Sequence, residues 1–391
     1  MGTLENREAL IVLNSLSGIG PIRTAQMLSV LGEPRAVLKA SENTLAAIPG
    51  IGEVLAHTVA HWEKTVDLSR ELALTERAGI RILTRDDPEY PARLKEIHDP
   101  PLCLYVRGPE GALLRLDRSL AMVGSRRTTL YGVAMAENLA GAAARAGWTV
   151  VSGLARGIDT VAHQAVVDVH GCTVAILGSG MAHIYPQDNV VLARKIMAEG
   201  GAIVSEFPML YPPDKRSFPM RNRIIAGMTL GTVVVEAGFK SGSLITANQA
   251  LEQGRLVFAV PGQVSNPQSR GCHALIKDGA KLVETFSDIL EEFEALPGLP
   301  RAEPAEAGTD DTADGSADSA PAKTLPPVAL TDLERRLVER LRDWGEAPID
   351  DLIAILEEPA SKVLAALLCL EMKHVVSQLP GRRATLRRAL G

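Results

Sequence analysis

The spacing of hydrophobic and polar positions changes three times along the chain. Up to about residue 79, apolar residues recur every three or four positions, which predicts helices. From residue 80, short apolar runs alternate with helical periods. No apolar period exists between residues 297 and 326, and helical spacing returns after them. We therefore expect a helical domain (1–79), an α/β domain (80–296), a disordered acidic linker (297–326) and a small C-terminal domain (327–391).

The central α/β domain shows a regular alternation of strand and helix from Leu120 onward. Its strands are apolar at every position, which is typical of a parallel sheet with helices on both faces. We predict a Rossmann-like, mostly parallel sheet, whose loops at the carboxyl ends of the strands form the site. The predicted strands are 79–84, 102–106, 120–123, 148–152, 173–177, 201–205, 232–236 and 256–260. The predicted helices are 129–146, 158–169, 189–199, 219–228, 244–253 and 286–295.

The two flanking domains have patterns of their own. Residues 16–20 and 48–52 both read apolar-x-Gly-apolar-Gly between helices, which predicts a SAM-like helix-hairpin-helix domain. Pro21 removes a backbone donor from the first hairpin and Glu53 would repel phosphate at the second, so we expect a structural or accessory role. Helices at 349–357 and 360–373 followed by a β-wing predict a winged helix-turn-helix domain, also accessory because its second helix is mainly Ala, Val and Leu.

Charge and cysteine usage restrict the function classes. The net charge of -6 argues against a nucleic-acid partner, but six of the 47 acidic residues lie within 302–322, where Lys and Arg are absent. The remaining 41 acidic residues balance the 41 basic ones. Local clusters of basic residues, rather than the net charge, therefore determine whether nucleic acid can bind. The four cysteines are scattered without a C-x-x-C pair, and His57 and His61 share a helix face without an evident third ligand. We expect no metal, no membrane segment and a cytoplasmic protein.

Four loops at predicted strand ends are rich in glycine and basic residues. Residues 149–163 are the most informative, because an apolar strand enters a turn with two glycines and Arg156 before a helix begins. Helix N-termini and glycine turns bind phosphate well. On one rim, these loops would form a single basic pocket. Its expected basic residues are Arg126, Arg127, Arg156, Arg221, Arg223 and Lys240.

The chain lacks the sequence motifs that bind nucleotide cofactors. The segment beginning Gly178-x-Gly180 has His183 where a third glycine is needed, and the chain has no P-loop pattern. We expect no cofactor and no triphosphate hydrolysis. A ring such as Phe218 beside arginines could instead stack on an unpaired base, which points to a single-stranded polynucleotide.

The loop motifs resemble, in order, those of the DNA-processing protein A (DprA/Smf) family over roughly residues 80 to 295. They include Gly-Ser-Arg at 124–126, Ser-Gly-Leu-Ala-Arg-Gly-Ile-Asp at 152–159, Phe-Pro-Met-Arg-Asn-Arg at 218–223 and Ser-Gly-Ser-Leu-Ile-Thr at 241–246. The resemblance implies a homodimer that binds single-stranded DNA and loads the recombinase RecA in transformation or recombination, without catalysis. The expected single-stranded DNA contacts are Gly124, Ser125, Arg126, Arg127, Gly153, Arg156, Gly157, Phe218, Arg221, Asn222, Arg223, Lys240, Ser241, Gly242 and Ser243.

Three titratable residues in these loops have competing interpretations. We expect Asp159 to be a helix N-cap, His163 to lie in the core, and Glu236 to be either an anchor for Arg221 or Arg223 or a general base. The alternative function is an enzyme that resembles the nucleoside-monophosphate phosphoribohydrolases. Their Pro-Gly-Gly-x-Gly-Thr-x-x-Glu motif has its glutamate where this chain has Thr246, which argues against that reaction.

Overall fold

The structure is a computed structural model that describes residues 4–294, 332–344, 346–356, 359–372, 376–379 and 383–386. The chain divides into two compact units, Met1–Ala302 and Glu303–Gly391. The predicted linker at 297–326 lies outside the described residues. Among the residues that are described, no helix is long and apolar enough to cross a membrane.

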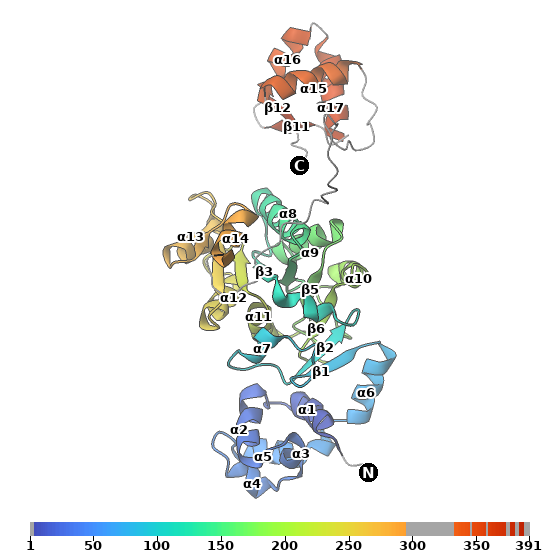
Figure 1. The fold of residues 1–391 in the computed structure, drawn as a ribbon, viewed down its shortest axis with the longest axis vertical. Helices are drawn as coiled ribbons and strands as arrows, with labels where there is room; N and C mark the ends of the chain where they lie inside the picture. Colours follow the sequence, from blue (N-terminus) through green and yellow to red (C-terminus); the bar gives the residue numbers. More distant parts are fainter. Residues whose placement is uncertain are drawn as a thin grey trace, which may run out of the picture. The chain divides into compact units, whose positions relative to one another are not determined.

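The first unit begins with a tandem of helical hairpins, drawn in blue in Figure 1. Leu13, Met27, Leu45 and Ile51 are buried in its core, as the helical spacing predicts. The hairpin turns at Gly18 and Gly50 have φ of 76° and 83°, which only glycine adopts easily. Its elements are α1 (Asn6–Ser15), α2 (Pro21–Leu31), α3 (Pro34–Lys39), α4 (Glu42–Ala46), α5 (Glu53–Ala60), η1 (Trp62–Lys64) and α6 (Leu68–Arg77).

The larger part of this unit is a nine-stranded sheet of order β1-β2-β6-β5-β4-β3-β7-β8-β9. The pairs β1–β2 and β2–β6 are antiparallel and the other pairs are parallel, so the prediction of a mostly parallel sheet is confirmed. The strands are β1 (Arg81–Thr84), β2 (Cys103–Arg107), β3 (Ser119–Val123), β4 (Thr149–Ser152), β5 (Thr173–Ile176), β6 (Ala202–Ser205), β7 (Gly231–Val234), β8 (Leu256–Ala259) and β9 (Lys281–Leu282).

Helices cover both faces of this sheet (Figure 1). On one face α8 (Leu130–Arg145), α9 (Ile158–Asp168) and α14 (Phe286–Glu294) bury alternate residues of β3, β4, β7 and β8, and α10 (Val190–Ala198) continues over β5 and β6. On the other face lie α7 (Ala92–Lys95), α11 (Ser217–Gly227), α12 (Gly242–Glu252) and α13 (Arg270–Lys277). The short 3-10 turns are η2 (Ala112–Asp117), η3 (Gln187–Asn189) and η4 (Pro267–Ser269).

The helical hairpins are joined to the sheet through the segment that follows β6. The Asn14 side chain donates to the carbonyl of Glu206 at 2.8 Å, and the backbone N–H of Met209 donates to the Glu71 carboxylate at 2.7 Å. Phe207 and Met209 are themselves buried. The N-terminal helices therefore fix the position of a loop at the carboxyl edge of the sheet.

The second unit has the winged-helix arrangement that the sequence predicts. A three-stranded sheet of order β10-β12-β11 accompanies three helices, with Leu337, Leu352, Leu367 and Val376 buried between them. Its elements are α15 (Asp332–Trp344), β10 (Glu346–Pro348), α16 (Ile349–Leu356), α17 (Ala360–Met372), β11 (Val376–Leu379) and β12 (Arg383–Leu386).

Candidate nucleic-acid interface

The predicted loops converge where the order of the strands reverses. From β3 the chain continues through β4, β5 and β6 on one side, and β7 then pairs with the other side of β3. Ligands of open α/β sheets bind at such a point, beyond the carboxyl ends of the strands. A cavity of about 280 Å³ opens there. It is lined by Arg126, Arg127, Gly153, Ala155, Arg156, Tyr185, Pro186, Phe218 and Arg221.

One wall of this cavity is aromatic. The Phe218 ring lies 5.8 Å from the Tyr185 ring between centroids, and the Arg126 guanidinium carbon lies 5.5 Å from the Phe218 centroid. Tyr185 is 46% exposed and Phe218 is half-buried. A planar ring that enters here meets π faces and a cation together, an arrangement that favours stacking. Tyr185 is not among the contacts expected from the sequence.

The charges above the cavity belong to three exposed residues, Arg126, Arg127 and Arg156, which we call the rim arginines. Arg156 forms an ion pair with Asp188 at 2.7 Å, and the two side chains are 63% and 64% exposed. An exposed pair of this kind contributes little and exchanges readily with solvent. The Arg156 guanidinium is therefore available to another anion.

The glycines serve close packing between loops. Gly157 has φ of 85°, and a Cβ there would lie 2.2 Å from the carbonyl oxygen of Ser125. A Cβ on Gly153 would lie 1.8 Å from Arg221 Nη1. Ser125 is buried and its hydroxyl donates to the carbonyl of Arg127 at 2.8 Å, which shapes the Gly-Ser-Arg loop. Gly157 and Ser125 therefore shape the loop that carries Arg126 and Arg127, and Gly153 leaves room for Arg221.

Beneath the rim, Arg221 and Asp159 form a buried layer. Arg221 is 3% exposed and its Nη1 donates to the carbonyl of Ile176 at 2.6 Å. Burial lowers the pKa of Arg221 to about 10, and the neighbouring Asp159 partly offsets this. The Asp159 carboxylate accepts from the N–H groups of Gly153 and Ala155 at 3.1 and 3.3 Å. Burial raises its pKa, against the opposing effects of Arg221 and those two bonds.

The predicted N-cap role of Asp159 is wrong. Gly157 is the N-cap of α9, and Asp159 lies within the first turn with its side chain directed back at the preceding loop. The prediction that His163 lies in the core is confirmed. Its Nδ1 is 2.8 Å from the Thr173 hydroxyl, and burial, together with Arg221, lowers its pKa to about 3.

The Arg223 guanidinium forms ion pairs with two carboxylates. Its Nε lies 2.8 Å from Asp99, and its Nη2 contacts Glu206, which like Arg223 is 7% exposed as a side chain. Glu236 does not anchor either arginine; its two oxygens accept from the backbone N–H and hydroxyl of Thr129 at 3.0 and 2.8 Å. We call Arg221 and Arg223 the buried arginines. The structure brings Arg221 to the cavity wall and turns Arg223 toward Asp99 and Glu206.

The remaining predicted residues line a broader adjoining cavity of about 720 Å³. Ser241 caps α12 and its hydroxyl lies 2.7 Å from that of Ser243. Lys240 and Gly242 are exposed, and the amide of Asn222 donates to the carbonyl of Gly242 at 3.5 Å. A helix N-terminus beside a lysine can hold a phosphate. Lys215 also lines this cavity and was not predicted.

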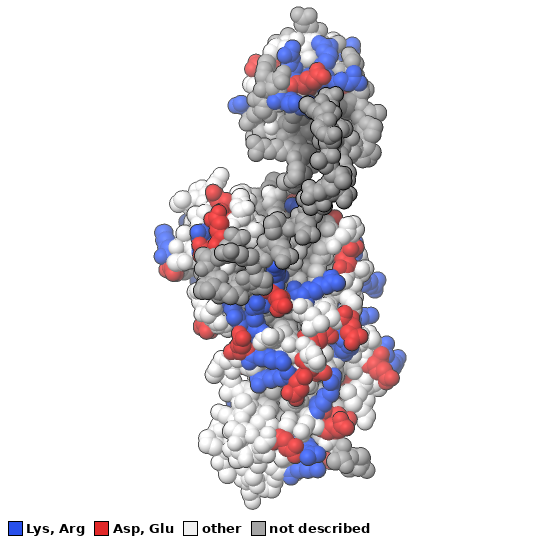
Figure 2. Space-filling view, in the orientation of Figure 1, with Lys and Arg blue, Asp and Glu red and all other residues white. Residues whose placement is uncertain are grey.

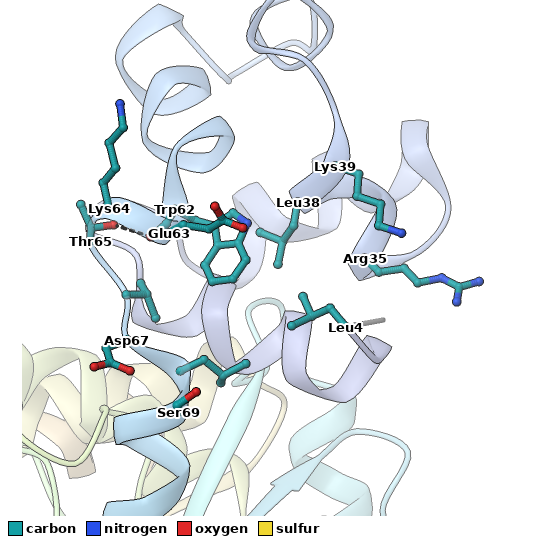
Figure 3. A pocket seen from close by; sticks show the side chains of 12 residues that line it. Leu4, Arg35, Leu38, Lys39, Trp62, Glu63, Lys64, Thr65, Asp67 and Ser69 are labelled. Atoms are coloured by element: carbon teal, nitrogen blue, oxygen red, sulfur yellow. Dashed lines mark hydrogen bonds between the residues drawn. The ribbon is translucent and has the colours of Figure 1, made fainter. Parts of the chain in front are cut away.

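The first unit also carries mixed charge and a second large hollow, on the helical hairpins. Figure 2 shows Lys and Arg interspersed with Asp and Glu across the face in view, and few charges over much of the helical hairpins. A hollow of about 870 Å³ on those hairpins has Trp62, Leu38 and Leu4 turned toward its middle, while Arg35, Lys39 and Lys64 point outward (Figure 3). Five of the six predicted basic residues line the two cavities at the carboxyl edge of the sheet, and Arg223 does not.

Comparison with known proteins agrees with this geometry. A family model described as DNA recombination-mediator protein A matches residues 81–294, more than half of the chain. The chain belongs to this family. A model of the DprA winged helix domain matches residues 321–382, and one of the SAM-like helix-hairpin-helix tandem matches residues 10–60.

Relatives that align over most of the chain confirm the DprA/Smf assignment. Protein Smf of Escherichia coli K12 is 39% identical over 325 residues, 82% of each chain. Protein Smf of Synechocystis is 34% identical over 392 residues, 95% of this chain and 96% of that one. The crystal structure of DNA processing protein A from Streptococcus pneumoniae has a TM-score of 0.63 and 33% identity, covering 74% of this chain and 98% of that one. A DNA-processing, recombination-mediator role follows.

Proposed function

We propose that this chain binds single-stranded DNA at the carboxyl edge of its sheet and, as a homodimer in the cytoplasm, loads the recombinase RecA onto it. The observation that carries the proposal is the cavity in which exposed guanidinium groups stand beside the Phe218 and Tyr185 rings. Arginine forks hold phosphates, and rings stack on bases that pairing does not conceal. Duplex DNA offers the phosphates but not the free base faces.

The proposed contacts are a subset of the predicted residues. Arg126, Arg127 and Arg156 take phosphates, Phe218 stacks, and Lys240 with the N-terminus of α12 takes a further phosphate. Gly124, Ser125, Gly153 and Gly157 shape the loops. Arg221 supports the cavity wall, and Arg223 has a structural role because its charge is matched by Asp99 and Glu206.

No bond-breaking step belongs to this proposal. The residues that line the two cavities include one carboxylate, Asp159, which already accepts two backbone N–H groups and is 7% exposed. Thr246, at the place of the phosphoribohydrolase glutamate, is buried in α12. Release of free base from AMP by the purified protein would support the enzyme instead.

The decisive measurement is fluorescence anisotropy of labelled oligo-dT across a salt series. Arg126→Ala and Arg156→Ala should each weaken binding about tenfold and reduce the salt slope by about one unit, because each removes one phosphate contact. Arg145→Ala is the control, since Arg145 is exposed at the far end of α8. Equal affinity of all three variants at moderate salt would refute the assignment.

Two further parts of the proposal need their own measurements. Sedimentation of the same samples should show a dimer. RecA loading should appear as faster RecA filament growth on DNA precoated with single-strand binding protein, and the Arg126→Ala, Arg156→Ala double variant should lose it. A double variant that still loads RecA would separate loading from this cavity.

A further inference from the structure

Three metal-ligating side chains meet on the helical hairpins, away from the DNA site. The sequence places His57 and His61 one turn apart at α5, and the structure adds Glu42 from α4. The His57 Nδ1 lies 3.0 Å from Glu42 Oε2, and the His61 Nδ1 lies 3.8 Å from the same oxygen. One ligand atom from each of the three residues lies within 4.8 Å of the other two.

We propose that Glu42, His57 and His61 form a binding site for a divalent transition-metal ion of the zinc class. Two imidazoles one helical turn apart and a carboxylate oxygen are donors that Zn²⁺ prefers to Mg²⁺ or Ca²⁺. Three protein ligands leave one coordination position to water. All three side chains are exposed to at least a third, so an ion can enter without opening the fold.

The distances fit such an ion after small side-chain rotations. Ligands about 2.0 Å from a tetrahedral zinc lie about 3.3 Å apart. The observed separations of 3.0 and 3.8 Å bracket this value. The imidazole rings lie 4.2 Å apart between centroids, and the His61 Nδ1 is also 3.1 Å from the carbonyl of His57. To bind the ion through Nδ1, His61 exchanges this carbonyl contact for the metal by rotation of its side chain.

A bound ion would connect the two helices on either side of the second hairpin turn. Helix α4 spans only Glu42–Ala46, a length that is marginal without tertiary support. It packs on α5 across the turn that contains Gly50 and Gly52. The ion therefore stabilises this hairpin, and its binding is independent of the DNA-contact assignment.

The test is equilibrium dialysis of the full chain against ZnCl₂ with the bound metal counted by mass spectrometry. The parent should bind about one zinc per chain through this site. His57→Gln or His61→Gln should lower the affinity by more than the roughly 10- to 100-fold that loss of an outer-shell partner costs, and Glu42→Gln should weaken it at least about tenfold. Zinc should raise the unfolding temperature of the parent but not of these variants.

A matched control exists on the same chain. The His170 Nδ1 lies 2.9 Å from Glu199, but within the described residues no third ligand joins that pair. His170→Gln should leave the zinc stoichiometry unchanged. The proposal fails if the parent binds no zinc at about 100 μM, or if His57→Gln and His61→Gln bind as the parent does. It fails equally if alkylating the thiols, including half-buried Cys172, removes the bound zinc.

Discussion

The rim arginines and the buried arginines come from the same predicted set of basic residues yet meet opposite surroundings. Arg156 is 63% exposed and paired with an equally exposed Asp188, whereas the Arg223 side chain is 7% exposed between Glu206 and Asp99. A charge in water costs nothing to keep and can change partners. A charge out of water is tolerated only with fixed partners. The rim arginines are therefore available to bind a ligand, whereas the buried arginines stabilise the fold.

The largest expected effect comes from removing Arg223 from its ion pairs with Glu206 and Asp99. Arg223→Met leaves Glu206 and Asp99 without their cation, and losing one partner of a buried ion pair costs about 3–5 kcal/mol. Urea unfolding should show this loss in the free energy of unfolding. Arg126→Met is the control and should change it by less than about 1 kcal/mol. If both variants unfold alike, the contrast between rim and buried arginines is wrong.

The next largest effect should be a pH dependence of stability caused by the buried His163. Burial beside Arg221 lowers the pKa of His163 from its ordinary value of 6.5 to about 3. As pH falls below 6.5, His163 takes up a proton in the unfolded chain but stays neutral in the folded chain. The free energy of unfolding therefore falls progressively toward pH 3. Between pH 7 and pH 5 this group alone should cost about 2 kcal/mol.

The contribution of His163 can be isolated by difference. Asp159 and Glu206 have raised pKa values, chiefly from burial, and act in the opposite sense because the folded chain binds their protons more tightly. Urea unfolding of the parent and of His163→Gln at both pH values cancels such terms. The loss between pH 7 and pH 5 should be smaller in the variant. Equal losses would mean that His163 is protonated in the folded state.

These contrasts explain how far the sequence could predict the site. Apolar strands and glycine turns are local patterns, and they predict the sheet, the winged helix and the convergence of the loops. The environment of Arg223 depends on Asp99 and Glu206, which reach it from other parts of the chain. The third partner of His57 and His61 comes from another helix. No local pattern distinguishes Arg221 from Arg156; only packing does.

A smaller effect should separate stacking from charge at the rim. Phe218→Leu keeps an apolar side chain against Gly178 but removes the ring beside Arg126 and Tyr185. It should weaken oligo-dT binding by about 1 kcal/mol, roughly fivefold, with an unchanged salt slope. Phe239→Leu is the control, since Phe239 is 73% exposed and lines neither cavity. A weaker salt slope in Phe218→Leu would mean that the ring acts by positioning Arg126.

The smallest effect should come from Asp188, the partner of the rim. Asp188→Asn removes an exposed ion pair and should leave the free energy of unfolding unchanged, but Arg156 then loses the carboxylate that competes with a phosphate. Oligo-dT should bind slightly more tightly at low salt, with no gain in high salt. Glu292→Gln changes the net charge equally and removes the exposed partner of Lys281, remote from the cavity. If both variants gain affinity equally, the gain reflects net charge. If only Asp188→Asn gains affinity, Asp188 competes with the DNA backbone for Arg156.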